Sequence, residues 1–165
     1  MTTLISPELN RAFNEQIGRE LFASNQYIAI ASYFDGRALK KLAAMFFEQS
    51  NEEREHAMKF VEYLNQVGGT VEVPAIQATT TEFKSAEEAV RLALKWELEV
   101  THQINELMTM AIAQKDYAAQ EFLDWFVKEQ VEEVSTMQDL LQIVQQVGEH
   151  YLIMVEAYLS HGGDE

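Results

Sequence analysis

The sequence predicts an all-α protein, namely a four-helix bundle with a long crossover and a short fifth helix at the C-terminal end. Four long segments each repeat apolar residues in alternating steps of three and four, which marks one face of an α-helix. Proline occurs only at Pro7 and Pro74, so no helix breaker interrupts these segments. We expect a single domain over residues 1–165, with helices over about 6–35, 37–67, 85–114, 116–147 and 149–160.

The first helical hairpin has signals at both of its ends. Ser6-Pro7 suits a helix start, with serine at the N-cap and proline at the first helical position. Asp35-Gly36-Arg37 is the break between its helices, and Gly68-Gly69 ends the second one. Residues 68–84 then carry Gly, Pro and Thr and few charges. This segment is too long for a tight turn, and at about 3.3 Å per extended residue it can run the length of a bundle.

The second hairpin begins at Ser85-Ala-Glu-Glu88, which matches a capping box. Gln114-Lys115-Asp116 forms the next break, and Asp116 is a suitable N-cap for the following helix. Gly148 ends that helix. The apolar stretch from Tyr151 to Leu159 is then expected to form the short fifth helix.

Composition excludes several classes of protein. The chain contains no cysteine, which excludes a disulfide framework, a thiolate zinc site and a cysteine-ligated iron–sulfur cluster. Its 27 acidic and 12 basic residues give a net charge of −15, which argues against nucleic acid as a partner. The opening residues lack the pattern of a secretory leader, and no apolar run is long enough to span a bilayer. We therefore expect a cytoplasmic protein with no membrane partner.

Polar residues interrupt the apolar stripes of all four long helices. Six positions that should carry apolar side chains hold Glu20, Glu53, His56, Glu97, Gln130 and Glu133. A buried carboxylate without a partner costs several kcal/mol, which is comparable to the net stability of a domain. Four glutamates in one core therefore need a compensating positive charge. Two divalent metal ions would balance them.

Hairpin geometry predicts that these groups meet at one level. Residues equidistant from the turn of an antiparallel hairpin lie side by side. Glu20 and Glu53 are equidistant from the Gly36-Arg37 turn, and Glu97 and Gln130 have the same separation about the second turn. His56 and Glu133 each follow three residues later on the same helix face. A long crossover between the hairpins would let all six groups converge.

A Glu on each of two helices and a Glu-x-x-His-type pair on the other two is the pattern of ferritin-like di-metal carboxylate proteins. The chain resembles a non-haem bacterial ferritin over nearly all its length, through Glu20, Tyr27, Glu53-x-x-His56, Glu97 and Gln130-x-x-Glu133. The resemblance implies that Glu20, Glu53 and His56 hold one iron. Glu53, Glu97 and Glu133 would hold the second, with Glu53 bridging, and Gln130 would orient a bound water or oxygen species.

Two aromatic residues are candidates for roles beside this centre. The resemblance implies that Tyr27 bonds a ligand and donates an electron; the alternative is a core tyrosine with a satisfied hydroxyl group. Trp125 is near Gln130 in the sequence and could act as a reductant, whereas ordinary packing is the alternative.

The resemblance also implies a third iron site and the absence of haem. A third iron would lie between Glu133 and the flanking acids Glu52, Glu129 and Glu132; the alternative is a set of solvated carboxylates. Haem is not expected, because Arg54 stands where bacterioferritins carry the haem-ligating methionine.

The function expected from the resemblance is iron storage. Fe(II) would be oxidised at the di-iron centre by O₂ or H₂O₂, and ferric oxide would accumulate inside a cage of 24 identical subunits. One alternative is a di-metal carboxylate enzyme that stores no iron, either manganese catalase-like or of the oxygenase type. Another is a metal-free helical bundle that binds a partner through an acidic face.

Overall fold

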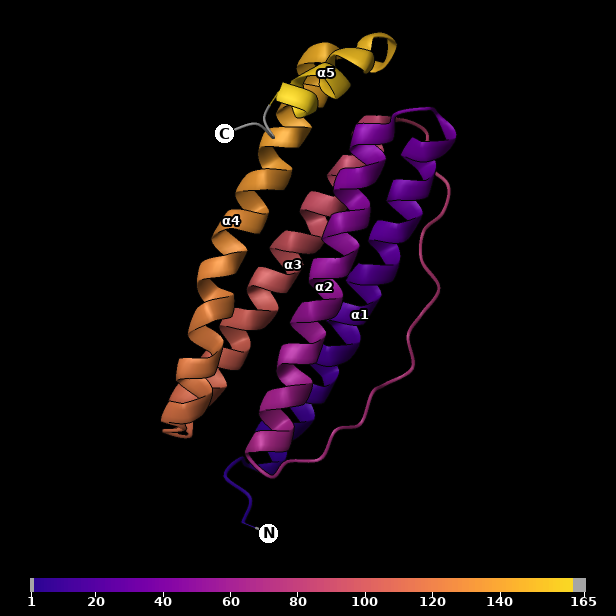
Figure 1. Cartoon of the computed structure of the whole chain (residues 1–165). Helices are drawn as coiled ribbons and strands as arrows, with labels where there is room; N and C mark the ends of the chain where they lie inside the picture. Colours follow the sequence, from indigo (N-terminus) through magenta and orange to yellow (C-terminus); the bar gives the residue numbers. More distant parts are fainter. Residues whose placement is uncertain (1, 162–165) are drawn as a thin grey trace.

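The computed structural model describes residues 2–161 and confirms the predicted fold class. The four long helices lie side by side, and a short fifth helix packs across one end of them (Figure 1). The helices are α1 (Pro7–Gly36), α2 (Lys40–Gln66), α3 (Ala86–Ala113), α4 (Tyr117–Val147) and α5 (Ile153–His161), and a 3₁₀ turn (Glu149–Tyr151) precedes α5. Within residues 2–161 no helix is both long and apolar enough to cross a membrane.

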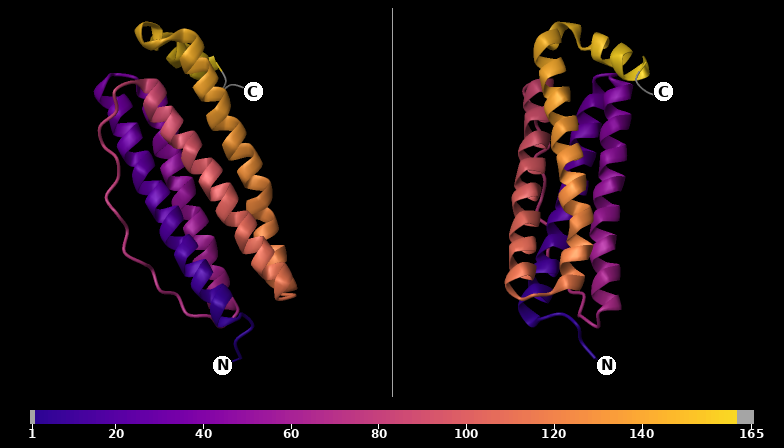
Figure 2. Two further views of the ribbon diagram at one scale, coloured as in Figure 1. Left: turned by 180° about the vertical axis from the view of Figure 1, so that it is seen from behind. Right: turned by 90° about the vertical axis from the view of Figure 1, so that its left-hand side faces the viewer.

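The bundle consists of two antiparallel hairpins joined by the crossover. Helices α1 and α2 form one hairpin and α3 and α4 form the other, and α1 also packs against α3. The crossover rises beside α1 along the length of the bundle, so α3 starts at the end where α1 stops (Figure 1). Figure 2 shows α5 turned sharply away from the axis of α4, across the end of the bundle opposite the N-terminus.

Two helix boundaries differ from the sequence-based expectation. Helix α2 begins at Lys40 rather than near residue 37, because Ala38 adopts a φ of 61° within the turn. The last expected helix is split at Leu152 into the 3₁₀ turn and α5. The expected N-caps do form: Ser6, Ser85 and Asp116 each accept a hydrogen bond from the backbone N–H three residues later.

A side chain of α5 caps the N-terminus of α2. The N-cap residue of α2, Leu39, has no side-chain capping bond. The buried carboxylate of Glu156 in α5 instead accepts from the backbone N–H groups of Lys41 and Leu42, at 3.0 Å each. A carboxylate at a helix N-terminus also interacts favourably with the helix dipole. Helix α5 is therefore fixed to the bundle by charge-assisted hydrogen bonds as well as by apolar packing.

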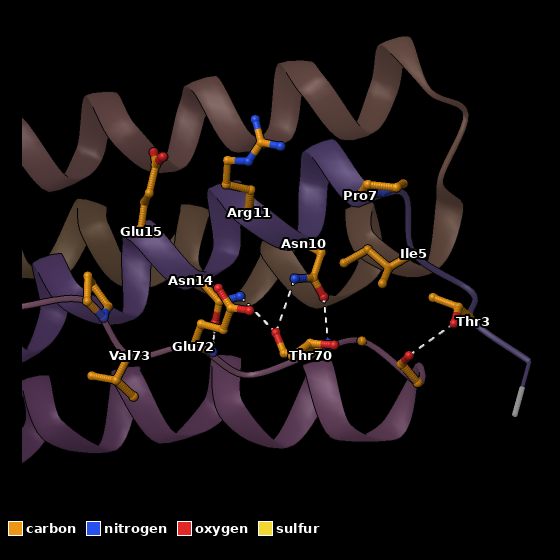
Figure 3. Close-up of a pocket in the computed structure, with 13 residues that line it drawn as sticks. Thr3, Ile5, Pro7, Asn10, Arg11, Asn14, Glu15, Thr70, Glu72 and Val73 are labelled. Atoms are coloured by element: carbon orange, nitrogen blue, oxygen red, sulfur yellow. Dashed lines mark hydrogen bonds between the residues drawn. The ribbon is translucent and has the colours of Figure 1, made fainter.

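Side-chain amides on α1 hold the crossover in place. Figure 3 shows Asn10 and Asn14 beside Thr70, at the edge of a surface pocket with a volume of about 590 Å³. Asn10 donates to the Thr70 carbonyl (3.1 Å) and accepts from its N–H (2.9 Å). Asn14 donates to the same carbonyl (2.8 Å), and Gln26 pairs in both directions with the backbone of Thr80. These amides replace the backbone partners that a segment without secondary structure lacks.

Gly18 lets the crossover approach α1 closely, and it provides a test of this arrangement. A Cβ atom at residue 18 would lie 2.3 Å from Cγ of Pro74. Gly18→Ala should therefore lower the free energy of unfolding by about 1–3 kcal/mol, the usual cost of overpacking. Gly36 is the matched control, since nothing lies within 4 Å of its added Cβ. Gly36→Ala should raise stability by up to about 1 kcal/mol; equal effects in thermal unfolding would contradict the close packing.

The core has two apolar regions with a polar layer between them. One region lies near α5 and includes Phe34, Phe46, Leu42, Val90 and Met137. The other lies near the opposite end and includes Phe13, Ile17, Phe60, Ile104 and Phe126. The polar residues singled out from the sequence fall between these two regions along every helix. The fold therefore places a polar site where water is excluded from both sides.

Candidate metal centre

The polar layer brings together groups from all four long helices. Helix α1 supplies Glu20, α2 supplies Glu53 and His56, α3 supplies Glu97, and α4 supplies Gln130 and Glu133. None of these six residues is more than 4% exposed. Their convergence follows from the hairpin registers, because each helix places its polar residue at the same height as that of its antiparallel neighbour. The structure therefore brings together all six residues that the sequence singles out.

The first half of the centre consists of Glu20, Glu53 and His56. Each offers a ligand atom, and these atoms all lie within 4.8 Å of one another. His56 Nδ1 is 3.4 Å from Glu53 Oε2 and 3.9 Å from Glu20 Oε2. Among the described residues, Glu20 Oε2, Glu53 Oε1 and His56 Nδ1 are buried and lack a hydrogen-bond partner. Buried polar atoms are normally paired, so this group has the character of an incomplete coordination shell.

The second half consists of Glu53, Glu97 and Glu133, whose ligand atoms also lie within 4.8 Å of one another. Glu53 therefore belongs to both groups and lies between them. The Tyr27 hydroxyl donates to Glu97 Oε1, and Tyr27 is completely buried. Gln130 Nε2 lies 3.2 Å from Glu97 Oε2. Tyr27 and Gln130 together fix the orientation of the Glu97 carboxylate.

Burial and mutual repulsion raise the carboxylate pKa values at the centre. Burial raises the pKa of Glu133 to about 8, and the charge of Glu97 adds to this increase. The pKa of Glu53 is raised well above its usual value by burial and then by Glu97. Burial, followed by the charge of Glu53, raises the pKa of Glu20 in the same way. The pKa of Tyr27 is raised by burial and by the adjacent Glu97, so the phenol keeps its proton.

The donor set suits a pair of iron or manganese cations. Four carboxylates and one imidazole match the preference of Fe(II), Fe(III) and Mn(II) for oxygen ligands with a nitrogen ligand. The unpaired atoms of Glu20, Glu53 and His56 point to the same kind of ligand, since a cation would satisfy all three. A cation would also remove the repulsion that raises the carboxylate pKa values. The residues present therefore fit two metal ions that share Glu53.

The acids expected to hold a third ion are only partly brought together. His56, Glu129 and Glu133 form a third group with ligand atoms within 4.8 Å. Glu52 is half-buried; burial raises its pKa, and the carboxylates of Glu48 and Glu129 add to the increase. Glu132 is exposed and belongs to none of the metal-ligand groups found among the described residues. The geometry therefore places Glu129 closer to the centre than Glu132.

Sequence reasoning missed two residues that support the ligands. Thr101 donates to the Glu97 carbonyl at 2.7 Å and lies 3.2 Å from Gln130 Nε2. Gln16 Nε2 donates to Glu20 Oε1 at 2.8 Å. The only sequence signal for these roles is spacing, since Gln16 and Thr101 lie one helical turn from Glu20 and Glu97 respectively.

Trp125 lies beside the centre and packs edge-on against the His56 ring, with 5.3 Å between ring centroids. Lys59 Nζ lies 4.2 Å from the centroid of the same indole ring, within the range of a cation–π interaction. The indole therefore limits how the imidazole of His56 can turn, which is the packing role that the sequence left open for this residue.

Comparison with known proteins agrees with the observed fold. A model of the ferritin-like domain matches residues 10–147. The chain is 39% identical to Ferritin BfrB of Mycolicibacterium smegmatis over 156 residues, which cover 94% of this chain and 86% of that protein. It is 37% identical to the bacterial non-heme ferritin of Staphylococcus haemolyticus over 146 residues, which cover 88% of each chain.

A solved ferritin structure has a similar fold. The open pore ferritin of Archaeoglobus fulgidus superposes with a TM-score of 0.92 at 34% sequence identity, covering 95% of this chain and 97% of that chain. Family match, sequence relatives and three-dimensional similarity all extend over the segment that carries the polar layer. The chain therefore belongs to the ferritin family.

Proposed function

We propose that this ferritin oxidises Fe(II) at the buried carboxylate–histidine centre and stores the ferric product. The observation that carries the proposal is the set of buried, unpaired ligand atoms on Glu20, Glu53 and His56. The second group, formed by Glu53, Glu97 and Glu133, supports a pair of ions rather than one. Iron is the substrate here and not a resident cofactor.

The proposed reaction balances with two Fe(II) ions and one O₂. Each Fe(II) loses one electron, and O₂ takes both electrons and two protons to give H₂O₂; alternatively H₂O₂ takes two electrons and two protons to give two molecules of water. The carboxylates supply negative charge that stabilises Fe(III) relative to Fe(II). The two Fe(II) ions supply both electrons, so the proposed role of Tyr27 is to orient Glu97 through its hydrogen bond. The proposed role of Gln130 is to orient a water or oxygen species beside the centre.

Storage requires more than one chain. We propose that the subunits assemble into a closed homo-oligomer of 24 copies, with a mineral of ferric oxide inside and a cytoplasmic location. The ferritin relatives and the ferritin structure with a similar fold support this part of the proposal. A di-metal enzyme that stores no iron, such as a manganese catalase-like or oxygenase-type protein, would have the same kind of centre. It would not accumulate iron beyond the ions that fill the centre.

The activity is tested by adding Fe(II) in small aerobic steps to metal-free protein while O₂ consumption is recorded. The proposal predicts a fast phase that saturates at about two Fe(II) per chain, since two ligand groups share Glu53. No fast phase at any Fe(II) ratio would count against a ferroxidase centre.

If a third ion binds beside Glu129, variants of Glu129 and Glu132 should differ in how many metal ions they bind. Glu129→Gln should remove one binding site from a metal titration, because Glu129 shares a ligand group with His56 and Glu133. Glu132→Gln is the matched control on α4, and it should leave the stoichiometry unchanged because Glu132 is exposed. Calorimetric titration of the metal-free proteins with Zn²⁺ measures both. Equal stoichiometry in the two variants would contradict a site at Glu129.

A further inference from the structure

We propose that Gln16, a buried amide on α1, is a positioning residue for Glu20. Its role would be to hold one oxygen of the Glu20 carboxylate so that the other oxygen faces the first metal position. The expected effect of Gln16 on the kinetics of Fe(II) oxidation rests on the proposed function. The effect of Gln16 on metal binding is independent of any oxidation chemistry.

The two carboxylate oxygens of Glu20 have different surroundings. Gln16 Nε2 donates to Glu20 Oε1 at 2.8 Å, from one turn earlier on the same helix. Glu20 Oε2 has no hydrogen-bond partner among the described residues and lies 3.9 Å from His56 Nδ1. One oxygen of Glu20 is thus occupied by the protein and the other is free on the side of His56 and Glu53.

Gln16 is itself held from two helices. It is 0% exposed, and its Nε2 also lies 3.4 Å from Gln103 Oε1 on α3. Its own Oε1 accepts from Arg19 Nη1 at 3.4 Å, and Gln103 Nε2 donates to Glu99 at 3.3 Å. This chain of hydrogen bonds leads from the buried ligand to the exposed side chains of Arg19 and Glu99. It fixes the amide plane of Gln16 and therefore the direction of its donor group.

An amide is well suited to this position because it carries no charge. A lysine at residue 16 would neutralise Glu20 and compete with a metal ion for it. A carboxylate would add a further negative charge to a centre that already holds four. A neutral donor orients Glu20 without either effect, as hydrogen-bonding groups behind metal ligands commonly do.

The test compares Gln16→Met with Gln26→Met. Both changes remove a buried amide from α1 and keep a side chain of similar length. Gln26 is 1% exposed and is bonded to the Thr80 backbone, away from the centre. Each metal-free protein is titrated with Co²⁺, whose visible absorption reports the ligand set, and Fe(II) oxidation is measured over a range of Fe(II) concentrations.

Gln16→Met should weaken Co²⁺ binding at one of the two positions by roughly tenfold or more, the usual cost of losing a group that orients a ligand. It should raise KM for Fe(II) more than it lowers kcat. Gln26→Met should keep the wild-type Co²⁺ affinity and KM while lowering thermal stability. Unchanged Co²⁺ affinity in Gln16→Met, or equal losses in both variants, would overturn the inference.

A second variant keeps the positioning role testable if Gln16→Met does not fold. Gln16→Asn keeps the amide but shortens it, so it cannot reach Glu20 Oε1 from the same backbone position. It should show the same loss of Co²⁺ affinity at one position, and wild-type affinity in this variant would also overturn the inference. Failure of the wild-type protein to oxidise Fe(II) would count against the proposed function alone. Wild-type oxidation with unchanged Co²⁺ affinity in both Gln16 variants would count against the positioning role alone.

Discussion

Replacing Glu53 by glutamine is expected to abolish fast Fe(II) oxidation, the largest loss of activity from any single substitution. Glu53 belongs to both ligand groups of the centre, so its loss affects both metal positions at once. Losing a group that merely orients a metal ligand already costs about 10–100-fold in affinity or activity. A shared ligand should cost at least the upper end of that range. Stopped-flow absorbance after mixing with aerobic Fe(II) measures the rate.

The same substitution should leave the metal-free fold intact or make it more stable. Glu53 is 1% exposed, and Glu97 and Glu133 repel its charge, so a neutral side chain of the same shape relieves that repulsion. Glu106→Gln, at an exposed position on α3, is the matched control and should change neither rate nor stability. A Glu53→Gln protein that oxidises Fe(II) at the wild-type rate would refute the assignment of the centre.

The metal-free protein is expected to lose stability as pH rises through the neutral range. Folding raises the pKa of Glu133 from 4.5 to about 8, chiefly by burial. Between these values the folded protein binds more protons than the unfolded chain, so the free energy of unfolding falls with increasing pH. A pKa that differs by one between the two states changes that free energy by about 1.4 kcal/mol, so Glu133 alone accounts for a few kcal/mol once the pH exceeds its folded pKa. The raised pKa values of Glu20 and Glu53 act in the same direction.

Thermal unfolding of protein held with a chelator, at about pH 5.5 and about pH 8.5, tests this expectation. Glu133→Gln should flatten the dependence, which separates the centre from the general effect of a net charge of −15. Zn²⁺ should flatten it as well, because a bound cation removes the penalty for ionised carboxylates. Metal-free protein whose stability increases over this pH range would contradict the raised pKa values.

The position of the centre could be predicted because it depends on backbone geometry alone. Glu20 and Glu53 lie side by side since they are equidistant from one turn, and the same holds for Glu97 and Gln130. The helical period then places His56 and Glu133 on the same faces one turn later. These relations need only the apolar stripes and the two breaks in the sequence.

The supporting contacts could not be predicted, because they depend on side-chain conformations and on contacts between distant segments. Gln16 and Thr101 are ordinary helix residues in the sequence, and their roles depend on which way each side chain turns. Glu156 and Leu42 are far apart in the chain, so their hydrogen bond depends on where α5 packs. The start of α2 differs from the expectation for a related reason, since the left-handed turn at Ala38 has no glycine to mark it.

Under the proposed function this chain both oxidises iron and stores it. The most direct test adds a large excess of Fe(II) aerobically to the metal-free protein and then separates the products by size-exclusion chromatography with iron detection. We expect hundreds of iron atoms to elute with a particle of roughly 450 kDa, since 24 chains of 18.9 kDa have that mass. Iron that stops at two ions per chain on a small oligomer would contradict storage and favour a di-metal enzyme. Protein that elutes without iron would contradict the metal centre itself.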